Sequence, residues 1–242
     1  MAVPKTTIWP LEPHTKTKHL ILGEYLAAWL PIMSKWNRRI VFIDGFAGPG
    51  RYSGGEEGSP LIALRTALEH NRLSPDCEFS FLFIEADKKR ADHLREEIEQ
   101  LKTERPFLKQ FSYEVANARF EEKINRVLIE LTGAQLAPTL AFIDPFGFEG
   151  LPMRLVAEIA KYPKCESLIT FMYEPVNRFF EHPSPKIQEH LEALFGTAEA
   201  RDLVKLTDDP EERFGRITAL YEAQLKAVAR FKFVRTFTMI NT

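Results

Sequence analysis

Short apolar segments alternate with amphipathic ones along most of the chain. Apolar runs rich in β-branched and aromatic residues predict strands over Arg39–Ile43, Phe79–Ile84, Phe111–Val115, Thr139–Ile143, Ser167–Tyr173 and Lys232–Ile240. Apolar residues at helical spacing predict helices over Lys18–Ser34, Pro60–His70, Lys88–Lys102, Arg119–Leu131, Leu151–Tyr162 and most of 177–229. Strands that alternate with helices predict an α/β fold with a mostly parallel sheet and helices on both faces.

Residues at the helix ends refine these boundaries. Pro31 is expected to end or kink the first helix, because proline removes a backbone donor inside a helix. Ser59 followed by Pro60 predicts an N-cap and a first helical residue. Asp87 is expected to cap the helix that begins at Lys88.

Composition limits the class of protein. Lys and Arg total 32 against 34 Asp and Glu, a formal charge of −2, so a nucleic-acid contact would be local rather than a broad basic face. The only cysteines, Cys77 and Cys165, exclude a disulfide framework and a Cys-built zinc site, and we expect no metal and a cytoplasmic setting. No apolar run approaches the roughly 20 residues that span a bilayer, so no membrane association is expected.

Unusual residues follow three of the predicted strands. Asp44-Gly-Phe-Ala-Gly-Pro-Gly50 follows the first strand, Glu85-Ala-Asp87 the second and Asp144-Pro-Phe-Gly147 the fourth. Ligands of open α/β sheets bind beyond the carboxyl ends of the strands. We therefore expect these segments to form one pocket.

Each segment suits a particular contact. The glycines let a ligand approach the backbone closely, but their spacing matches neither a phosphate loop nor the dinucleotide fingerprint, which disfavours a nicotinamide dehydrogenase. Glu85 can accept hydrogen bonds from both hydroxyls of a ribose. Asp144 and the stiff turn at Pro145 can hold the two hydrogens of an amino group, with Phe146 facing a ring. Taken singly, each segment also suits an ordinary turn or a solvated carboxylate.

Together the segments resemble class I S-adenosylmethionine-dependent methyltransferases. Phe42-Ile-Asp44-Gly-Phe46-Ala-Gly48 is similar to the Asp-x-Phe-x-Gly motif that many nucleic-acid methyltransferases place around the methionine part of the cofactor. Asp144-Pro-Phe-Gly147 resembles the Asp-Pro-Pro-Tyr motif of enzymes that methylate exocyclic amines, with Phe for the second Pro and Gly for Tyr.

A closer resemblance covers nearly the whole chain. Trp9-Pro-Leu-Glu12-Pro-His14-Thr-Lys-Thr-Lys18-His19, Asp44 to Tyr52, Gly58-Ser-Pro60 and Asp144-Pro-Phe-Gly147 together resemble the three-Cys-motif partner (TcmP) family. The resemblance implies a Rossmann-like class I methyltransferase fold over residues 1–242, with a helical extension over 1–38 and a helical insertion over about 177–229. It also implies a phage Gp37/Gp68-type partner protein.

The methyltransferase resemblance assigns roles to individual residues. It implies that S-adenosylmethionine is held by Asp44, Gly45, Phe46, Gly48, Gly50 and Glu85, and that the acceptor is held by Asp144, Pro145 and Phe146. Asn117 is expected either to bind the adenine or to cap a helix. Arg51 can contact a phosphate and Tyr52 a base, while His14 and Lys18 either meet the cofactor or an anionic substrate, or are solvated.

Three expectations follow for the whole protein. The leading hypothesis is a methyltransferase acting on nucleic acid, with an exocyclic amine as an acceptor, in a phage or mobile-element context. The alternative is a non-catalytic protein of the same fold that binds or assembles with a partner. Because the chain stops at Thr242, right after Lys232–Ile240, we expect the sheet to lack the last hairpin of class I methyltransferases, through truncation or because a partner covers the edge.

Overall fold

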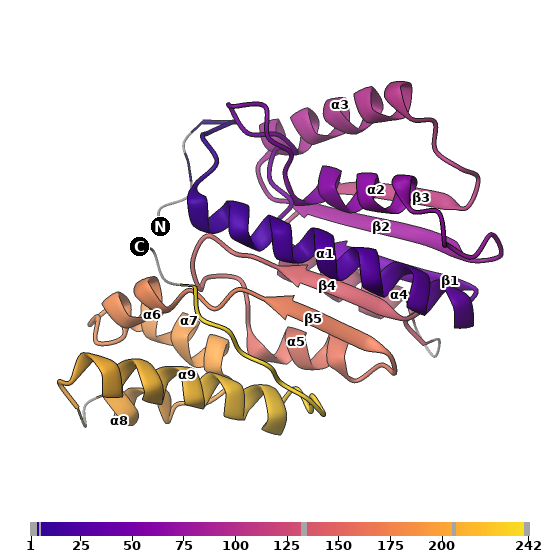
Figure 1. Cartoon of the computed structure of the whole chain (residues 1–242). Helices are drawn as coiled ribbons and strands as arrows, with labels where there is room; N and C mark the ends of the chain where they lie inside the picture. Colours follow the sequence, from indigo (N-terminus) through magenta and orange to yellow (C-terminus); the bar gives the residue numbers. More distant parts are fainter. Residues whose placement is uncertain (1–3, 5, 132–134, 205–206, 240–242) are drawn as a thin grey trace.

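A parallel β-sheet forms the centre of the molecule (Figure 1). The computed structural model describes residues 4, 6–131, 135–204 and 207–239. In this part the strands run in the order β3-β2-β1-β4-β5, and every neighbouring pair is parallel. Their bounds are β1 Arg39–Asp44, β2 Glu78–Glu85, β3 Phe111–Asn117, β4 Thr139–Ile143 and β5 Cys165–Ile169.

Helices cover both faces of the sheet and one of its edges. Figure 1 shows the last four helices, coloured orange to yellow, gathered beside β5. The helices are α1 Pro13–Trp36, α2 Ser59–Glu69, α3 Lys88–Glu104, α4 Phe120–Glu130, α5 Met153–Ala160, α6 Tyr173–Phe179, α7 Pro185–Phe195, α8 Ala200–Val204 and α9 Pro210–Ala227. This is the parallel α/β architecture that the alternating pattern predicts, and it is Rossmann-like, as the resemblance implies.

Successive residues of a strand enter two different hydrophobic clusters. Phe42 and Phe83 pack in the cluster formed with α1, α2 and α3. Ile43 and Ile84, one residue further along, pack in the cluster formed with α4, α5 and the helices beside β5. Because the strands are buried on both faces, they read as continuous apolar runs rather than as alternating ones.

The strand order places three strand ends next to one another. The chain moves outward from β1 to β3 and then crosses back to β4, so β1 lies between β2 and β4. In register, Asp44 lies opposite Phe83 on β2 and Phe142 on β4, while Glu85 lies opposite Asn117. The carboxyl ends of β1, β2 and β4 therefore share one edge, at the point where the strand order reverses.

The predicted strand over Lys232–Ile240 is wrong in the part that the structure describes. Residues 232–239 form no strand, and Ile240 lies outside the described residues. Phe231 and Val234, three residues apart, pack against the hydrophobic cluster, and the Thr236 hydroxyl donates to Glu222 of α9. β5 is the edge strand that such a segment could join, but residues 232–239 form no pairing with it and lie against side chains instead.

Several smaller boundaries also differ from the prediction. Pro31 does not end α1, which continues to Trp36 because tertiary packing outweighs one lost hydrogen bond. Gly58, not Ser59, is the N-cap of α2, and Ser59 is already helical. β5 begins at Cys165 and ends at Ile169, and Tyr173 begins α6. No helix of the described part combines the length and apolarity needed to cross a bilayer.

Candidate active site at the carboxyl ends of β1, β2 and β4

The glycine turn after β1 is fixed to the strands on either side of it. The Gly45 amide donates to the Phe142 carbonyl at 2.9 Å, and the Ala47 amide donates to the Ile84 carbonyl at 2.9 Å. Gly48 has φ +65°, a left-handed conformation that glycine adopts without steric cost. Its amide donates to Glu85 Oε2 at 2.9 Å. These hydrogen bonds therefore hold the turn against the ends of β2 and β4.

Glu85 connects the glycine turn to the start of α3. Its Oε1 accepts from the Asp87 amide at 2.7 Å, while Oε2 accepts from the Gly48 amide. Asp87 in turn caps α3 as predicted, accepting from the Arg90 amide at 3.0 Å. Burial raises the pKa of Glu85, although both amides and Arg90 favour its charged form. Each carboxylate oxygen can still accept a second hydrogen bond, so the two ribose contacts remain chemically available.

Asp44 is the most deeply buried carboxyl group of this edge. It has no exposed surface, and its Oδ1 accepts from the Phe46 amide at 3.1 Å. Its Oδ2 is buried without a hydrogen-bond partner of normal geometry. Burial raises its pKa to about 7, against the effect of the nearby Ser59 hydroxyl. An unpartnered buried acceptor is costly, which marks this oxygen as a position where a ligand's amino group would fit.

Asp144 is bound by a lysine from the other end of the chain. Lys18 Nζ of α1 lies 2.6 Å from both Asp144 oxygens. The two side chains are only 10% and 14% exposed. A cation thus occupies the side of Asp144 where the sequence predicts the amino group of a methyl acceptor.

The space between these carboxylates is filled by side chains of the chain itself. Gly48 and Gly50 are buried, and Trp9 lies over the turn, 3.8 Å from the position of a Cβ on Gly48. The Trp9 ring meets the edges of Tyr52 and Phe146, with ring centres 5.8 and 5.6 Å apart. We call this filled space, bordered by Asp44, Glu85 and Asp144, the strand-end crevice. The sequence predicts an open pocket here, whereas the structure has it occupied.

Asn117 secures the end of β3 to the end of β2. Its side-chain amide donates to the backbone carbonyls of Glu85 and Ala86, each at 3.0 Å. It does not cap a helix, since the N-cap of α4 is Arg119. Only its carbonyl oxygen is left for an adenine amino group, and that role stays a prediction.

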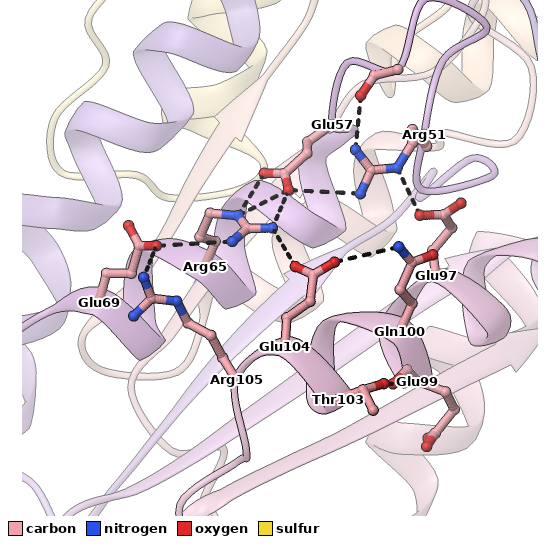
Figure 2. Close-up of polar contacts among 11 residues, drawn as sticks. Arg51, Glu57, Arg65, Glu69, Glu97, Glu99, Gln100, Thr103, Glu104 and Arg105 are labelled. Carbon is pink, nitrogen blue, oxygen red and sulfur yellow. Dashed lines mark hydrogen bonds and ion pairs between the residues drawn. The ribbon is translucent and has the colours of Figure 1, made fainter.

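Arg51 lies in a network of ion pairs rather than free at the surface, as Figure 2 shows. Its Nε donates to Glu97 of α3 at 2.7 Å, and its Nη1 donates to the Gly55 carbonyl at 2.8 Å. The network continues along α2 and α3 through Glu57, Arg65, Glu69, Glu104 and Arg105. A phosphate contact by Arg51 stays a prediction, and it would have to compete with these carboxylates.

Tyr52 and His14 are the remaining predicted site residues. Tyr52 packs against His19 with ring centres 5.7 Å apart, and burial together with Asp144 and Asp44 raises the pKa of its hydroxyl. His14 lies 3.4 Å from Glu12 through Nδ1. Within the described residues, no three His, Cys, Asp or Glu side chains converge as they would around a metal ion.

A cleft of about 700 Å³ opens next to the strand-end crevice, on the β5 side. His14 and Lys18 of α1 line it, together with Tyr173, Tyr221, residues 167–172 and most of the C-terminal segment 231–239. Its volume falls within the range of small-molecule pockets. Lys18 therefore separates a covered crevice from an open cleft.

Two buried residues of this site titrate in opposite directions. The folded pKa of Asp44, about 7, lies above its ordinary 3.8, so the stability it contributes is complete below pH 4 and is lost as the pH rises to 7. Burial lowers the pKa of His19 from 6.5 to about 4, so its contribution is present above pH 6.5 and is lost as the pH falls to 4. Between pH 4 and 6.5 the two groups change the stability with pH in opposite directions, so their slopes cancel.

We expect Asp44→Asn to expose the His19 contribution. Relative to the wild type, the variant should gain stability with pH at about 1.4 kcal/mol per pH unit in this window, the value for one proton. Urea unfolding of both proteins at pH 4.5, 5.5 and 6.5 measures the difference in slope, in which other groups cancel. Equal slopes for the two proteins would show that Asp44 ionises normally in the folded state.

The sequence gives no role to two residues that shape this edge. Trp9 stands inside the motif before α1, so an aromatic residue beside the conspicuous His14 and Lys18 was an available signal. Arg90 looks like any charged residue of α3, yet it is 5% exposed, with its guanidinium 4.9 Å from the Trp9 ring centre. No feature of the sequence distinguishes it from the exposed arginines.

Comparisons with known proteins leave the family open. No protein-family model matches the sequence, and no curated protein matches it significantly. Among solved structures, the chain is similar to one described as "Putative methyltransferase yhhF from Escherichia coli". The two are 17% identical over 66% of this chain and 68% of that one, with a TM-score of 0.38.

Proposed function

We propose that this protein is an S-adenosylmethionine-dependent methyltransferase acting on nucleic acid. The observation that carries the proposal is the arrangement of Asp44, Glu85 and Asp144. Asp44 and Glu85 end β1 and β2, Asp144 directly follows β4 at the reversal point of the parallel sheet, and the glycine turn is hydrogen-bonded to Glu85. This is the position at which open α/β sheets bind nucleotide-like ligands.

The donors and acceptors of the strand-end crevice fit the cofactor. Asp44 Oδ2, which lacks a partner, suits the amino group of a methionine part, and Glu85 has lone pairs for two ribose hydroxyls. The cofactor, when bound, supplies a methyl group on a sulfonium. The space itself is taken by Trp9, so binding requires that this ring move.

Asp144 would hold and orient the acceptor. An exocyclic amine can donate both hydrogens to the turn at Asp144 and Pro145, and Phe146 lies beside it. Lys18 now holds that carboxylate, and an arriving amine would replace it as donor. Alignment of the two reacting groups is the largest contribution that such a site makes.

The alternative is a non-catalytic protein that binds or assembles with a partner, such as a Gp37/Gp68-type protein. A specific observation favours it: both the strand-end crevice and Asp144 are occupied by the chain's own side chains, Trp9 and Lys18. Under this alternative the chain would retain the fold without turnover. Labelled methyl transfer separates the two functions.

We expect Asp144→Asn to lower kcat/KM for methyl transfer by at least about 100-fold, because the acceptor loses its orienting carboxylate. The assay follows a radiolabelled methyl group from S-adenosylmethionine into DNA and, separately, RNA. Asp76→Asn is the matched control. It changes an exposed aspartate just before β2, at the amino ends of the strands and away from the proposed site. Transfer that is equal in all three proteins would remove Asp144 from the reaction, and no transfer into either substrate would favour the non-catalytic alternative.

A further inference from the structure

The Trp9 ring lies over the glycine turn, within the strand-end crevice to which the proposed function assigns the cofactor. It covers the glycine turn at Gly48, whose amide is bonded to Glu85, the expected ribose acceptor. The Arg90 guanidinium lies 4.9 Å from the Trp9 ring centre and 6.0 Å from that of Phe146. A flat bicyclic ring is thus already held by a cation, an aromatic edge and the backbone of the turn.

Among the described residues, few polar contacts hold the segment that carries Trp9. The Ser53 amide donates to the Trp9 carbonyl at 3.0 Å. Arg90 Nη2 donates to the carbonyl of Pro4 and lies 3.5 Å from that of Thr6. Arg90 Nε is buried and has no partner within the described residues, so this guanidinium is not fully satisfied in the present arrangement.

The same end of the chain also covers Asp144. Lys18, in the second turn of α1, holds both oxygens of that carboxylate. Residues within ten positions of each other therefore occupy the expected cofactor position and the expected acceptor position. The two halves of the site are closed by one stretch of the N-terminal region.

We propose that residues 6–12 are a cover that competes with the cofactor for the strand-end crevice, and that Trp9 is the side chain that fills it. This inference rests on the proposed function. The indole and a purine are flat bicyclic rings of similar size, so the crevice holds one of them at a time. Binding of the cofactor requires the cover to leave, and Arg90 Nη2 then becomes free to take a new partner.

The measured affinity for the cofactor should therefore depend on how often the cover is open. An apparent dissociation constant equals the intrinsic one divided by the fraction of molecules that are competent to bind. Trp9 is only partly buried, so the segment can open; with on the order of one tenth of the molecules open, the apparent dissociation constant would be about tenfold above the intrinsic one. Removing the Trp9 ring should then tighten binding about tenfold.

The test is calorimetric titration of S-adenosylhomocysteine into the full chain. We expect Trp9→Ala to bind about tenfold more tightly than the wild type. Trp36→Ala is the matched control, since it removes an exposed indole from the far end of α1 and should bind like the wild type. Circular dichroism melting confirms that all three proteins are folded.

The outcomes separate the cover from the proposed function. Equal affinities for the wild type and Trp9→Ala would support cofactor binding but contradict the proposal that the cover competes with it. Weaker binding by Trp9→Ala would also reject it, because Trp9 would then be a wall of the pocket. No binding by any of the three proteins would overturn the proposed function, and the cover with it.

Hydrogen exchange gives a second readout that needs no variant. In the wild type, the Ser53 amide is protected through the Trp9 carbonyl, so saturating S-adenosylhomocysteine should speed its exchange. The Gly48 amide, bonded to Glu85, should stay protected as an internal reference. Slower exchange at Ser53 on binding would mean that the ligand stabilises the segment in its present position, which contradicts the proposal.

Discussion

Lys18→Met is expected to lower the free energy of unfolding by about 4 kcal/mol. Lys18 and Asp144 are both nearly buried, and the ammonium lies 2.6 Å from each carboxylate oxygen. Methionine keeps the length of the side chain but leaves Asp144 unpaired. Removing one partner of a buried ion pair costs much more than the pair contributes, because an uncompensated charge remains.

The control and the rescue for this variant come from the same contacts. Lys16→Met changes an exposed lysine of the same helix and should alter stability by less than about 0.5 kcal/mol. Adding Asp144→Leu to Lys18→Met should restore most of the loss, since neither charge is then left buried. Urea unfolding of the four proteins measures these values. A loss below 1 kcal/mol for Lys18→Met alone would show that water reaches Asp144.

Gly50→Ala should lower the free energy of unfolding by about 3 kcal/mol, for two additive reasons. Gly50 has φ +85°, where an L-residue is strained. The added Cβ would also lie 2.8 Å from Leu94 Cδ1 and 3.5 Å from Leu94 Cα, and Leu94 is completely buried and cannot move aside.

Gly55→Ala separates the two causes. Gly55 has φ +91°, yet a Cβ there meets no atom within 4 Å. It should therefore lose only the conformational part, about 1 kcal/mol. Thermal or urea unfolding of the two variants compares them directly. Losses of equal size would mean that the packing of α3 against the glycine turn contributes nothing.

The sequence predicts the sheet and its site-bearing edge well, and the reason is local. Buried strands such as Thr139–Ile143 are continuous apolar runs, and the structure has this one with the same bounds. Asp44, Glu85 and Asp144 immediately follow or end such runs, so the rules for parallel sheets bring them together. Asp87 as a helix cap likewise depends only on its neighbours in the chain.

What the sequence does not predict depends on contacts between distant residues. The sequence allows Lys18 to be a ligand contact or a solvated charge, and only the fold brings it to Asp144, 126 positions away. Trp9 is a conspicuous aromatic residue in the sequence, but the rings that it packs against, Tyr52 and Phe146, belong to other segments. Lys232–Ile240 has the composition of a strand, yet what decides the outcome is whether it pairs with the edge strand β5 or lies against side chains, and no local pattern contains that information.

The position of α1 has a consequence for how the chain folds. Trp29 Nε1 donates to Glu166 of β5 at 3.1 Å, and Asn37 accepts from Lys164 at 2.9 Å. These partners are 137 and 127 positions apart, so the first helix cannot complete its contacts until the last strand has been synthesised. Long-range contacts of this kind slow folding, because a large loop must close before they form. On the ribosome, the apolar face of α1 can pack against β1 and α2 as soon as these have emerged, while its polar contacts with β5 should form last.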